Sequence, residues 1–342
     1  MTVINIYKES FFYDVILHAE KDLLAEIIEE KSKFYTQRSI PKKSGIRILN
    51  CLAKESELYR LQSRLSKYFF QNIPIPDGIY GFVKGASYRD FLLPHRKTGK
   101  SDRYYLRIDI DSFFDSITTK LLNETLSYYF KTTDEVSNST LLKNTVDLIT
   151  LNDALPQGAV TSPVVSNIVF RQLDLRIKRY CDKLNITYTR YADDMLFSSE
   201  SKFLNEDYFM KKIYWILKSK NFKINYSKIR KGINEISLNG FVVGGNIRIS
   251  RKKKSDISNA LFLFQSGGQP KNIKQYIDRL NLANLNYRVS KFDNKSSVIN
   301  YLTGYRSFLI DWIPENDEEY YEVICNMIGR IENLILSVNR LN

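Results

Sequence analysis

Two adjacent aspartates, Asp193 and Asp194, stand between two short β-prone runs in the stretch ITYTRYADDMLFSS, residues 186–199. β-Branched and aromatic residues favour strands, and a short break between two such runs predicts a hairpin. The hairpin would carry both carboxylates at its tip. Neighbouring carboxylates repel each other unless a cation lies between them, and Mg²⁺ is the usual cation where a triphosphate must also be held. An ordinary Asx-type turn is the alternative interpretation.

The stem of this hairpin is expected to be packed. Side chains alternate between the two faces of a strand, so Tyr188 and Arg190 are predicted on one face and Thr189 and Tyr191 on the other. A long helix is predicted from Ser162, with apolar residues at every third or fourth position. We expect that helix to lie across the sheet that includes the hairpin.

The charge and the aromatic content indicate a polyanionic partner. The chain of 342 residues has a formal net charge of +13, and its 23 Tyr and 20 Phe supply rings on which bases can stack. Nucleic acid is therefore favoured over a membrane surface, although charge alone also suits an ordinary basic protein. The hydrophobic fraction of 43% is that of a globular chain. Its length allows two or three domains, or one enzyme with subdomains.

Cysteine and histidine are too sparse to predict a zinc site. Cys51, Cys181 and Cys325 lie far apart, and His18 and His95 are the only histidines. Neither a secretory leader nor an apolar stretch of membrane-spanning length is apparent. We expect a cytoplasmic protein with reduced thiols that does not contact a membrane.

Helices are predicted near both ends of the chain. Residues 1–40 are expected to be mainly helical, with Pro41 marking the end, and residues 42–49 to form a short turn and strand. The apolar spacing predicts another helix from Glu55. After Ser250 the chain is expected to be helical throughout, ending in a long amphipathic helix.

Segments with acidic residues, a glycine turn or a terminal lysine occur at three further places. The predicted strand YYLRIDIDSFF, residues 104–114, ends in Asp109 and Asp111. The turn LPQGAVTSP, residues 155–163, precedes the long helix, and its Ser-Pro pair is a good helix start. FKINYSK, residues 222–228, is a probable strand with a lysine at its end. Each segment alone is a weak signal.

Taken in order, these segments resemble the reverse transcriptases. The similarity runs from about Gly78 to Ser250 and is carried by RIDIDSFFDSI, LPQGAVTSP, YADD and FKINYSK. It implies an α+β fold of the right-hand polymerase type, with fingers, a palm built on an antiparallel sheet backed by helices, and a helical thumb. The expected division is fingers 1–105, a first active-site palm strand 106–118, an insertion of the fingers or palm 119–160, palm 161–250 and helical thumb 251–342.

The resemblance implies an RNA-directed DNA polymerase with two Mg²⁺ ions, for which Mn²⁺ is an expected substitute. Asp109, Asp193 and Asp194 would hold the ions, with Ile110 as a further ligand. One ion would lower the pKa of the primer 3′-hydroxyl, and the other would steady the triphosphate and the leaving pyrophosphate. Lys228 matches the lysine thought to protonate the pyrophosphate. An ordinary surface lysine is the competing interpretation.

Phe114 matches the family position of a bulky side chain that would clash with a ribose 2′-hydroxyl. An apolar ring fills the space of that hydroxyl and cannot bond it, which favours deoxynucleotides. Phe113 is expected to be a core residue instead. Asp111 shares a strand face with Asp109 and is expected to cap the turn rather than assist catalysis.

Four more positions would contact the incoming nucleotide. Gln157 and Gly158 match the segment that lines the nucleotide pocket, where a glycine lets the backbone approach the substrate. Lys43 and Arg47 would clasp the triphosphate as charge-assisted donors.

A basic run at the start of the predicted thumb would bind nucleic acid. It consists of Arg251, Lys252, Lys253 and Lys254.

GFVKGASY, together with the size of the chain, is similar to bacterial retron enzymes and to defence-associated reverse transcriptases. Two retron marks that are associated with recognition of the retron's own RNA are altered. FLLPH keeps only His95 of the pattern Asn-Ala-x-x-His, and Leu238–Gly240 replaces Val-Thr-Gly. Retron and other defence-associated types therefore both remain open, and an RNase H, endonuclease or toxin domain is not expected.

The implied partners are dNTPs, a noncoding RNA that serves as template or primer, and its DNA product. A separate effector protein or a second reverse transcriptase is a further candidate partner, and oligomerisation is left open. Two rival functions fit parts of the sequence. A polymerase-shaped scaffold would bind RNA without chemistry, although it would not need three carboxylates. A plain basic RNA-binding module would show salt-sensitive RNA affinity without dependence on dNTPs.

Overall fold

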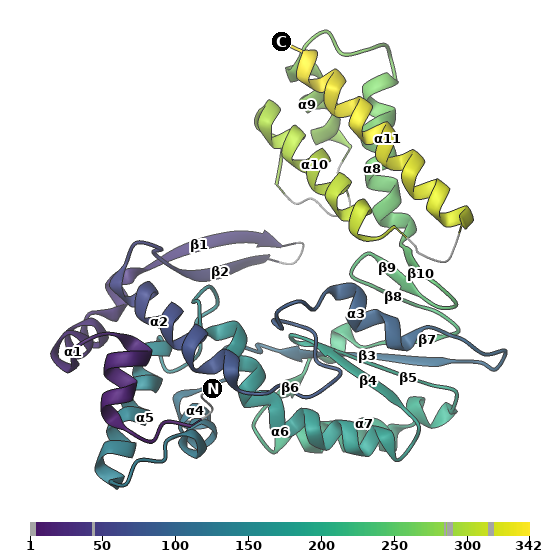
Figure 1. The fold of residues 1–342 in the computed structure, drawn as a ribbon. Helices are drawn as coiled ribbons and strands as arrows, with labels where there is room; N and C mark the ends of the chain where they lie inside the picture. The colour runs from purple at the N-terminus through teal and green to yellow at the C-terminus, as the bar shows by residue number, and fades with distance from the viewer. Residues whose placement is uncertain (1–4, 43–44, 284, 286–289, 314–317) are drawn as a thin grey trace. The chain divides into compact units, whose positions relative to one another are not determined.

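The computed structural model describes residues 5–42, 45–283, 285, 290–313 and 318–342 (Figure 1). It is an α+β structure with an antiparallel sheet backed by helices, as predicted. The chain forms two compact units, described separately below. Unit 1 comprises Met1–Ile40, Ile46–Ile236 and Val243–Asn246, and unit 2 comprises Pro41–Gly45, Ser237–Val242 and Ile247–Asn342.

Strand β3, which comes first in the chain among the strands of the main sheet of unit 1, lies at the centre of that sheet. The strand order is β4-β5-β3-β6, and β7 also pairs with β3. The bounds are β3 Tyr104–Asp111, β4 Thr187–Tyr191, β5 Asp194–Ser199, β6 Lys223–Ile224 and β7 Arg230–Ile233. Every position of β3 before its last residue is buried or nearly so, because helices and neighbouring strands enclose it. Such a strand holds whatever side chains it carries in fixed positions.

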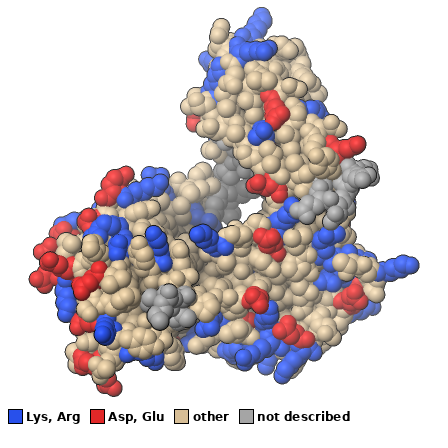
Figure 2. All heavy atoms as spheres, viewed as in Figure 1, with Lys and Arg blue, Asp and Glu red and all other residues tan. Residues whose placement is uncertain are grey.

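Helices α6, Ser162–Asp182, and α7, Asp207–Lys218, lie along the sheet (Figure 1). The apolar spacing that predicted α6 is confirmed, since Leu173 and Ile177 are almost completely buried. Ser162 does not act as the helix cap, because Thr161 precedes the helix and no side chain bonds its first amides. Lys and Arg gather over α6 and α7 in Figure 2.

Four further helices complete unit 1 around the same apolar core. They are α1 Lys21–Glu29, α2 Glu57–Tyr68, α4 Thr119–Leu126 and α5 Glu135–Ile149. A fifth, the short α3 at Tyr88–Leu92, belongs to unit 1 but lies outside this core. Before α1, residues Phe11–Leu17 form a π-helical segment.

The prediction that residues 1–40 are helical up to Pro41 is wrong at its end. After the helical turn Lys31–Phe34, the chain forms strand β1, Tyr35–Lys42, which pairs with β2, Gly45–Leu52. Pro41 lies inside β1. Proline lacks an N–H group, and a strand with a partner on one side only can accept it.

Unit 2 is mainly helical, as predicted for the end of the chain. Its helices are α8 Arg251–Gln265, α9 Ile273–Leu282, α10 Lys295–Asp311 and α11 Glu318–Arg340. The apolar stripe of α11 faces inward, with Ile324, Ile331 and Val338 fully buried. A three-stranded sheet in the order β10-β9-β8 consists of β8 Ile236–Leu238, β9 Phe241–Val243 and β10 Ile247–Ile249. All its residues except Ile236 and Val243 belong to unit 2. Within the described residues, every helix is too short or too polar to cross a bilayer.

Candidate active site

Strands β4 and β5 form the predicted hairpin, with Asp193 in its turn and Asp194 at the start of β5. The turn needs Ala192 at a φ of +55°, a left-handed conformation that costs energy for a residue with a Cβ. The alternation of the stem is also confirmed. Tyr188 and Arg190 both bond to α6, whereas Thr189 bonds on the opposite side.

Asp109 lies on the neighbouring strand at the same end of the sheet. In the antiparallel register of β3 and β5, Asp109 is directly opposite Asp194. The Ile110 amide donates to the Asp193 carbonyl at 3.0 Å. Directly opposed residues in an antiparallel pair have Cα atoms about 4.5 to 5.5 Å apart. Carboxylates that are more than eighty positions apart in the sequence therefore meet at one sheet end.

The electrostatics of Asp193 are consistent with this crowding. Burial raises the pKa of the Asp193 carboxyl, and the charges of Asp194 and Asp109 raise it further. Asp109 and Asp194 are themselves buried, with 3% and 7% of their surface exposed. Removing carboxylates from water costs free energy unless positive charge is nearby.

Two cationic side chains supply positive charge at the carboxylates. The Lys228 Nζ donates to Asp109 Oδ1 at 2.8 Å, and it comes from the helical turn Tyr226–Lys228. The predicted strand around residues 222–228 is therefore shorter than expected, because only β6 is extended. Arg107 donates to Asp194 Oδ1 through Nε at 2.8 Å and Nη2 at 2.5 Å. Arg107 was not predicted, although its place two residues before Asp109 puts both on one strand face.

The donor set fits a hard divalent cation, since it consists of carboxylate oxygens. Among the described residues, however, no group of three His, Cys, Asp or Glu side chains lies in a coordinating arrangement. Ion pairs with Lys228 and Arg107 orient the carboxylates of Asp109 and Asp194 instead. Ile110 has no side-chain donor, so only its backbone carbonyl could serve as the predicted ligand.

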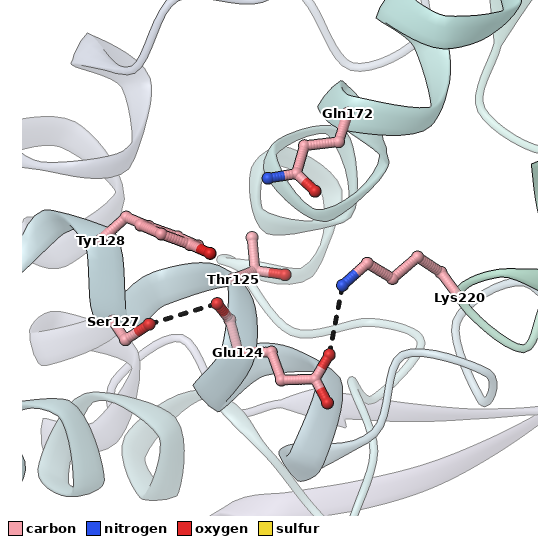
Figure 3. Close-up of a pocket in the computed structure, with 6 residues that line it drawn as sticks. All are labelled: Glu124, Thr125, Ser127, Tyr128, Gln172 and Lys220. Carbon is pink, nitrogen blue, oxygen red and sulfur yellow. Dashed lines mark hydrogen bonds and ion pairs between the residues drawn. The ribbon is translucent and has the colours of Figure 1, made fainter.

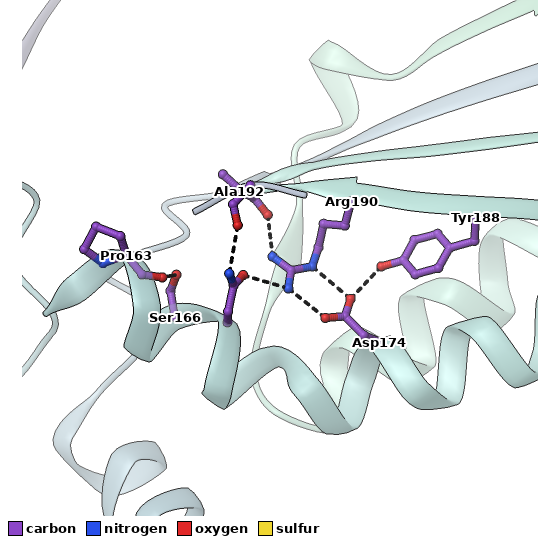
Figure 4. A network of polar contacts seen from close by, with 8 residues as sticks. Pro163, Ser166, Asp174, Tyr188, Arg190 and Ala192 are labelled. Carbon is purple, nitrogen blue, oxygen red and sulfur yellow. Dashed lines mark hydrogen bonds and ion pairs between the residues drawn. The ribbon is translucent and has the colours of Figure 1, made fainter. Parts of the chain in front are cut away.

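A buried ion pair holds the turn from below (Figure 4). The Arg190 guanidinium donates to both carboxylate oxygens of Asp174 on α6, at 2.8 and 2.7 Å, and neither residue is more than 1% exposed. Tyr188 also donates to Asp174. The remaining Arg190 donors reach the Ala192 carbonyl at 2.9 Å and the Asn167 side chain at 3.1 Å. The carbonyl before Asp193 is thus anchored to α6.

A distant segment supports the turn from another side. The Arg190 amide donates to the Gly78 carbonyl, and the Tyr80 amide donates to the Arg190 carbonyl, so residues 78–80 extend the sheet beside β4. A Cβ on Gly81 would lie 2.2 Å from the Ala192 nitrogen. This close approach of two backbones explains the glycine. Sequence analysis cited this region, GFVKGASY, only for its similarity to retron enzymes and did not predict what it touches.

The two phenylalanines that follow β3 differ in burial, as expected. Phe113 is 4% exposed and packs in the core against Phe170 and Phe222. Phe114 is only half-buried, and its ring centroid lies 6.0 Å from that of Phe82.

Gln157 and Gly158 lie in the loop before α6, beside strand β2. The Asn50 amide donates to the Gln157 carbonyl at 2.8 Å. Gly158 has a φ of +114°, and a Cβ there would lie 2.8 Å from the Asn50 carbonyl oxygen. The close contact with the β2 backbone is therefore enough to explain why residue 158 is a glycine. Of the two predicted triphosphate contacts, Arg47 is an exposed residue of β2, and Lys43 lies outside the described residues.

The basic run at the start of α8 divides into two pairs. Arg251 and Lys252 are exposed. The Lys253 ammonium lies 3.5 Å from the centroid of the Phe308 ring, and that of Lys254 lies 4.7 Å from the Tyr320 ring. Burial lowers the pKa of Lys253 to about 8. The two exposed residues are therefore better placed to contact phosphate than the two that lie against rings.

His95 is completely buried, so its ring cannot contact RNA in this structure. Nε2 lies 2.8 Å from Thr189 Oγ1, and Nδ1 lies 2.8 Å from Ser198 Oγ. Thr189 donates its proton to a carbonyl, so Nε2–H donates to Thr189, and a neutral ring satisfies both contacts. Burial, with a smaller effect of the Arg103 charge, lowers the pKa of His95 to about 3.

A polar pocket of about 390 Å³ lies elsewhere in unit 1, between α4, α6 and Lys220 (Figure 3). Glu124 and Lys220 form an ion pair across it at 3.2 Å. None of the predicted site residues lines this pocket.

Residues 40–296 match the family described as Reverse transcriptase (RNA-dependent DNA polymerase). The chain is 31% identical over 243 residues to the retron Ec73 reverse transcriptase of Escherichia coli, covering 66% of this chain and 74% of that protein. It is also 31% identical to the retron Mx65 reverse transcriptase of Myxococcus xanthus, covering 50% of this chain but 42% of that protein.

Two solved structures match at lower sequence identity. Telomerase from Candida albicans is 13% identical, with 94% of this chain and 68% of that chain covered and a TM-score of 0.45. The foamy viral protease-reverse transcriptase is 13% identical, with 90% and 34% covered and a TM-score of 0.40. The assignment rests on the sequence matches, because both TM-scores lie below 0.5. The family match covers about three quarters of the chain, and the chain therefore belongs to the reverse transcriptases, RNA-directed DNA polymerases, and is of the bacterial retron type.

Proposed function

We propose that the three aspartates form the catalytic centre of RNA-templated DNA synthesis. The observation that carries the proposal is the register of β3 and β5, which sets Asp109 opposite Asp194 beside the turn that holds Asp193. In this proposal Asp109, Asp193, Asp194 and the Ile110 carbonyl hold two Mg²⁺ ions, or Mn²⁺ as a substitute. When bound, such ions activate the primer hydroxyl and stabilise charge on the phosphates.

The side chains around the carboxylates have separate roles in this proposal. Lys228 donates a hydrogen bond to Asp109, and in this proposal its ammonium gives a proton to the leaving pyrophosphate. Arg107 orients Asp194 through two bonds to one oxygen. The turn itself is kept rigid by Arg190 and by the backbone of Gly81, so that the carboxylates need little rearrangement during the reaction.

For the nucleotide, we propose that Phe114 excludes the ribose 2′-hydroxyl, since its ring is half-buried and borders the core beside β3. Gln157 and Gly158 would line the pocket, and Lys43 and Arg47 would hold the triphosphate. The earlier division into fingers, palm and thumb is part of the same proposal, with exposed Arg251 and Lys252 contacting nucleic acid.

We further propose that the template or primer is a noncoding RNA, and that the DNA product serves antiphage defence in the cytoplasm. The similarity to retron enzymes of Escherichia coli and Myxococcus xanthus supports this role. Sequencing the RNA and DNA that copurify from the native host tests it. A long unique RNA joined to a short cDNA is expected for a retron, whereas repetitive or untemplated DNA would favour another defence polymerase.

The catalytic assignment is tested by the double substitution Asp193→Asn with Asp194→Asn. We expect Mg²⁺-dependent incorporation of dNTPs on an RNA template to be lost while the protein remains folded by circular dichroism. Asp111→Asn is the matched control, because this exposed carboxylate lies at the end of β3, the strand that carries Asp109. Persistent DNA synthesis in the double variant would contradict the assignment, and retained biological activity without synthesis would favour a scaffold.

A further inference from the structure

Phe82 adopts a backbone conformation that its residue type disfavours. Its φ is +62°, and among the non-glycine residues with positive φ that the structure describes, it is the one with a bulky apolar side chain. The Val83 amide donates to the Tyr80 carbonyl at 3.4 Å, which closes a turn with Phe82 at the third position. A positive φ at that position normally selects Gly or Asn. The chain therefore carries a phenylalanine where a smaller residue would fit without strain.

Burial does not explain why Phe82 is tolerated. The residue is 41% exposed, so its ring gains only part of the stabilisation that a core phenylalanine receives. Bulky residues in strained conformations that do not serve packing are found mainly at functional sites.

The surroundings of Phe82 indicate which function is involved. The preceding residue, Gly81, lies against the Ala192 nitrogen in the turn that carries Asp193. On its other side, the Phe82 ring lies 6.0 Å from the Phe114 ring, with an angle of 50° between the planes. Ring pairs at this separation attract each other and restrict each other's rotation. The segment thus joins the catalytic turn to Phe114.

We propose that Phe82 is a positioning residue for sugar discrimination, acting through Phe114. The inference rests on the proposed role of Phe114 in excluding the 2′-hydroxyl. A ring that excludes one hydroxyl works only while it stays in place, and half-buried Phe114 has core contacts on one part of its surface. Phe82 supplies a second support, and the strained turn holds that support at a fixed distance from the carboxylates.

The test compares wild-type protein with Phe82→Gly. Steady-state kcat and KM are measured for a dNTP and the matching rNTP on one RNA template and primer, together with the thermal unfolding midpoint. Glycine relieves the positive φ, which offsets the loss of the partly buried ring, so the midpoint is expected to change little. Discrimination against the rNTP should fall about tenfold, the scale that a few apolar contacts supply.

Asn221→Gly is the matched control. Asn221 is exposed and has the same φ of +62°, so the substitution changes backbone strain without removing a ring near Phe114. Its discrimination ratio should equal that of wild type. In a Phe114→Ala background, Phe82→Gly should have no further effect on the ratio, because the two residues act as one unit.

Three results would overturn the inference. An unchanged ratio in Phe82→Gly would remove the positioning role, and a clearly lower unfolding midpoint would make Phe82 a structural residue. If Phe82→Gly lowers discrimination equally in wild-type protein and in the Phe114→Ala variant, Phe82 acts independently of Phe114. Failure of the proposed function is distinguishable, because wild-type protein would then incorporate no dNTP at all.

Discussion

His95 is buried with hydrogen bonds at both ring nitrogens, and this geometry ties its charge to folding. In the native state its pKa is about 3, whereas an unfolded histidine has a pKa of about 6.5. Between these values the unfolded chain binds the proton and the native ring does not. The contribution of His95 to stability is therefore complete above pH 6.5 and is lost as the pH falls toward 3.

We expect the free energy of unfolding of wild-type protein to fall below pH 6.5, with His95 contributing about 1.4 kcal/mol per pH unit at most. His95→Gln should lower stability at pH 7 and make this pH dependence shallower. Urea unfolding at pH 5 and pH 7 measures both effects. His18→Gln is the control, since that ring is exposed. An equal slope in wild type and His95→Gln would show that another group sets the acid sensitivity.

At the scale of elements, the catalytic turn depends on α6 as much as on its own hairpin. Arg190 connects Asp174 on the helix to the Ala192 carbonyl in the turn. A buried pair of this kind contributes little net stability compared with apolar residues, but removing one partner leaves an uncompensated charge. The pair is therefore better explained by where it holds the turn.

This explanation predicts different outcomes for single and double variants. Arg190→Met should cost about 3 to 5 kcal/mol of unfolding free energy, because Asp174 is left buried and unpaired. Adding Asp174→Leu should restore most of the stability but not the kcat for dNTP incorporation, since Ala192 still lacks its donor. Chemical denaturation and steady-state kinetics on the same samples measure the two quantities.

The partly exposed pair Glu124 and Lys220 provides the control. The double variant Glu124→Leu with Lys220→Met should change the free energy of unfolding by less than about 1 kcal/mol and leave kcat unchanged. Recovery of both stability and kcat in the Arg190 and Asp174 double variant would mean that the pair has no positioning role.

Sequence patterns predicted the elements whose signals are local. The alternation around Asp193 predicted the hairpin, and the spacing after Ser162 predicted α6. The strand β1 was missed because residues 35–42 follow a helical stretch without a clear break, and Pro41 indicated a helix end. The contacts that define the site were also missed. The packing of Gly81 on Ala192, or of Gly158 on Asn50, depends on tertiary structure that no local spacing encodes.

At the scale of the whole molecule, the net charge of +13 governs association with nucleic acid. Displacement of counterions from phosphates makes such binding strongly dependent on salt. The logarithm of the RNA association constant should therefore fall linearly with the logarithm of the salt concentration. If 6 to 10 phosphates are contacted, the affinity should fall by a factor of about 10³ to 10⁵ between 50 and 200 mM salt. Filter binding at several salt concentrations gives the slope.

The variant with Asp193→Asn and Asp194→Asn retains every Lys and Arg, so its slope should match that of wild type. A slope near zero in both proteins would indicate that RNA is bound mainly through bases rather than phosphates.

The central place of β3 affects how the protein is made. This largely buried strand ends at residue 111, but its partner strands β5, β6 and β7 begin only at residues 194, 223 and 230. While the ribosome adds the intervening residues, the nascent chain carries a strand with unpaired edges, because none of its partner strands has yet been synthesised. We therefore expect truncated products that stop before residue 194 to precipitate rather than accumulate.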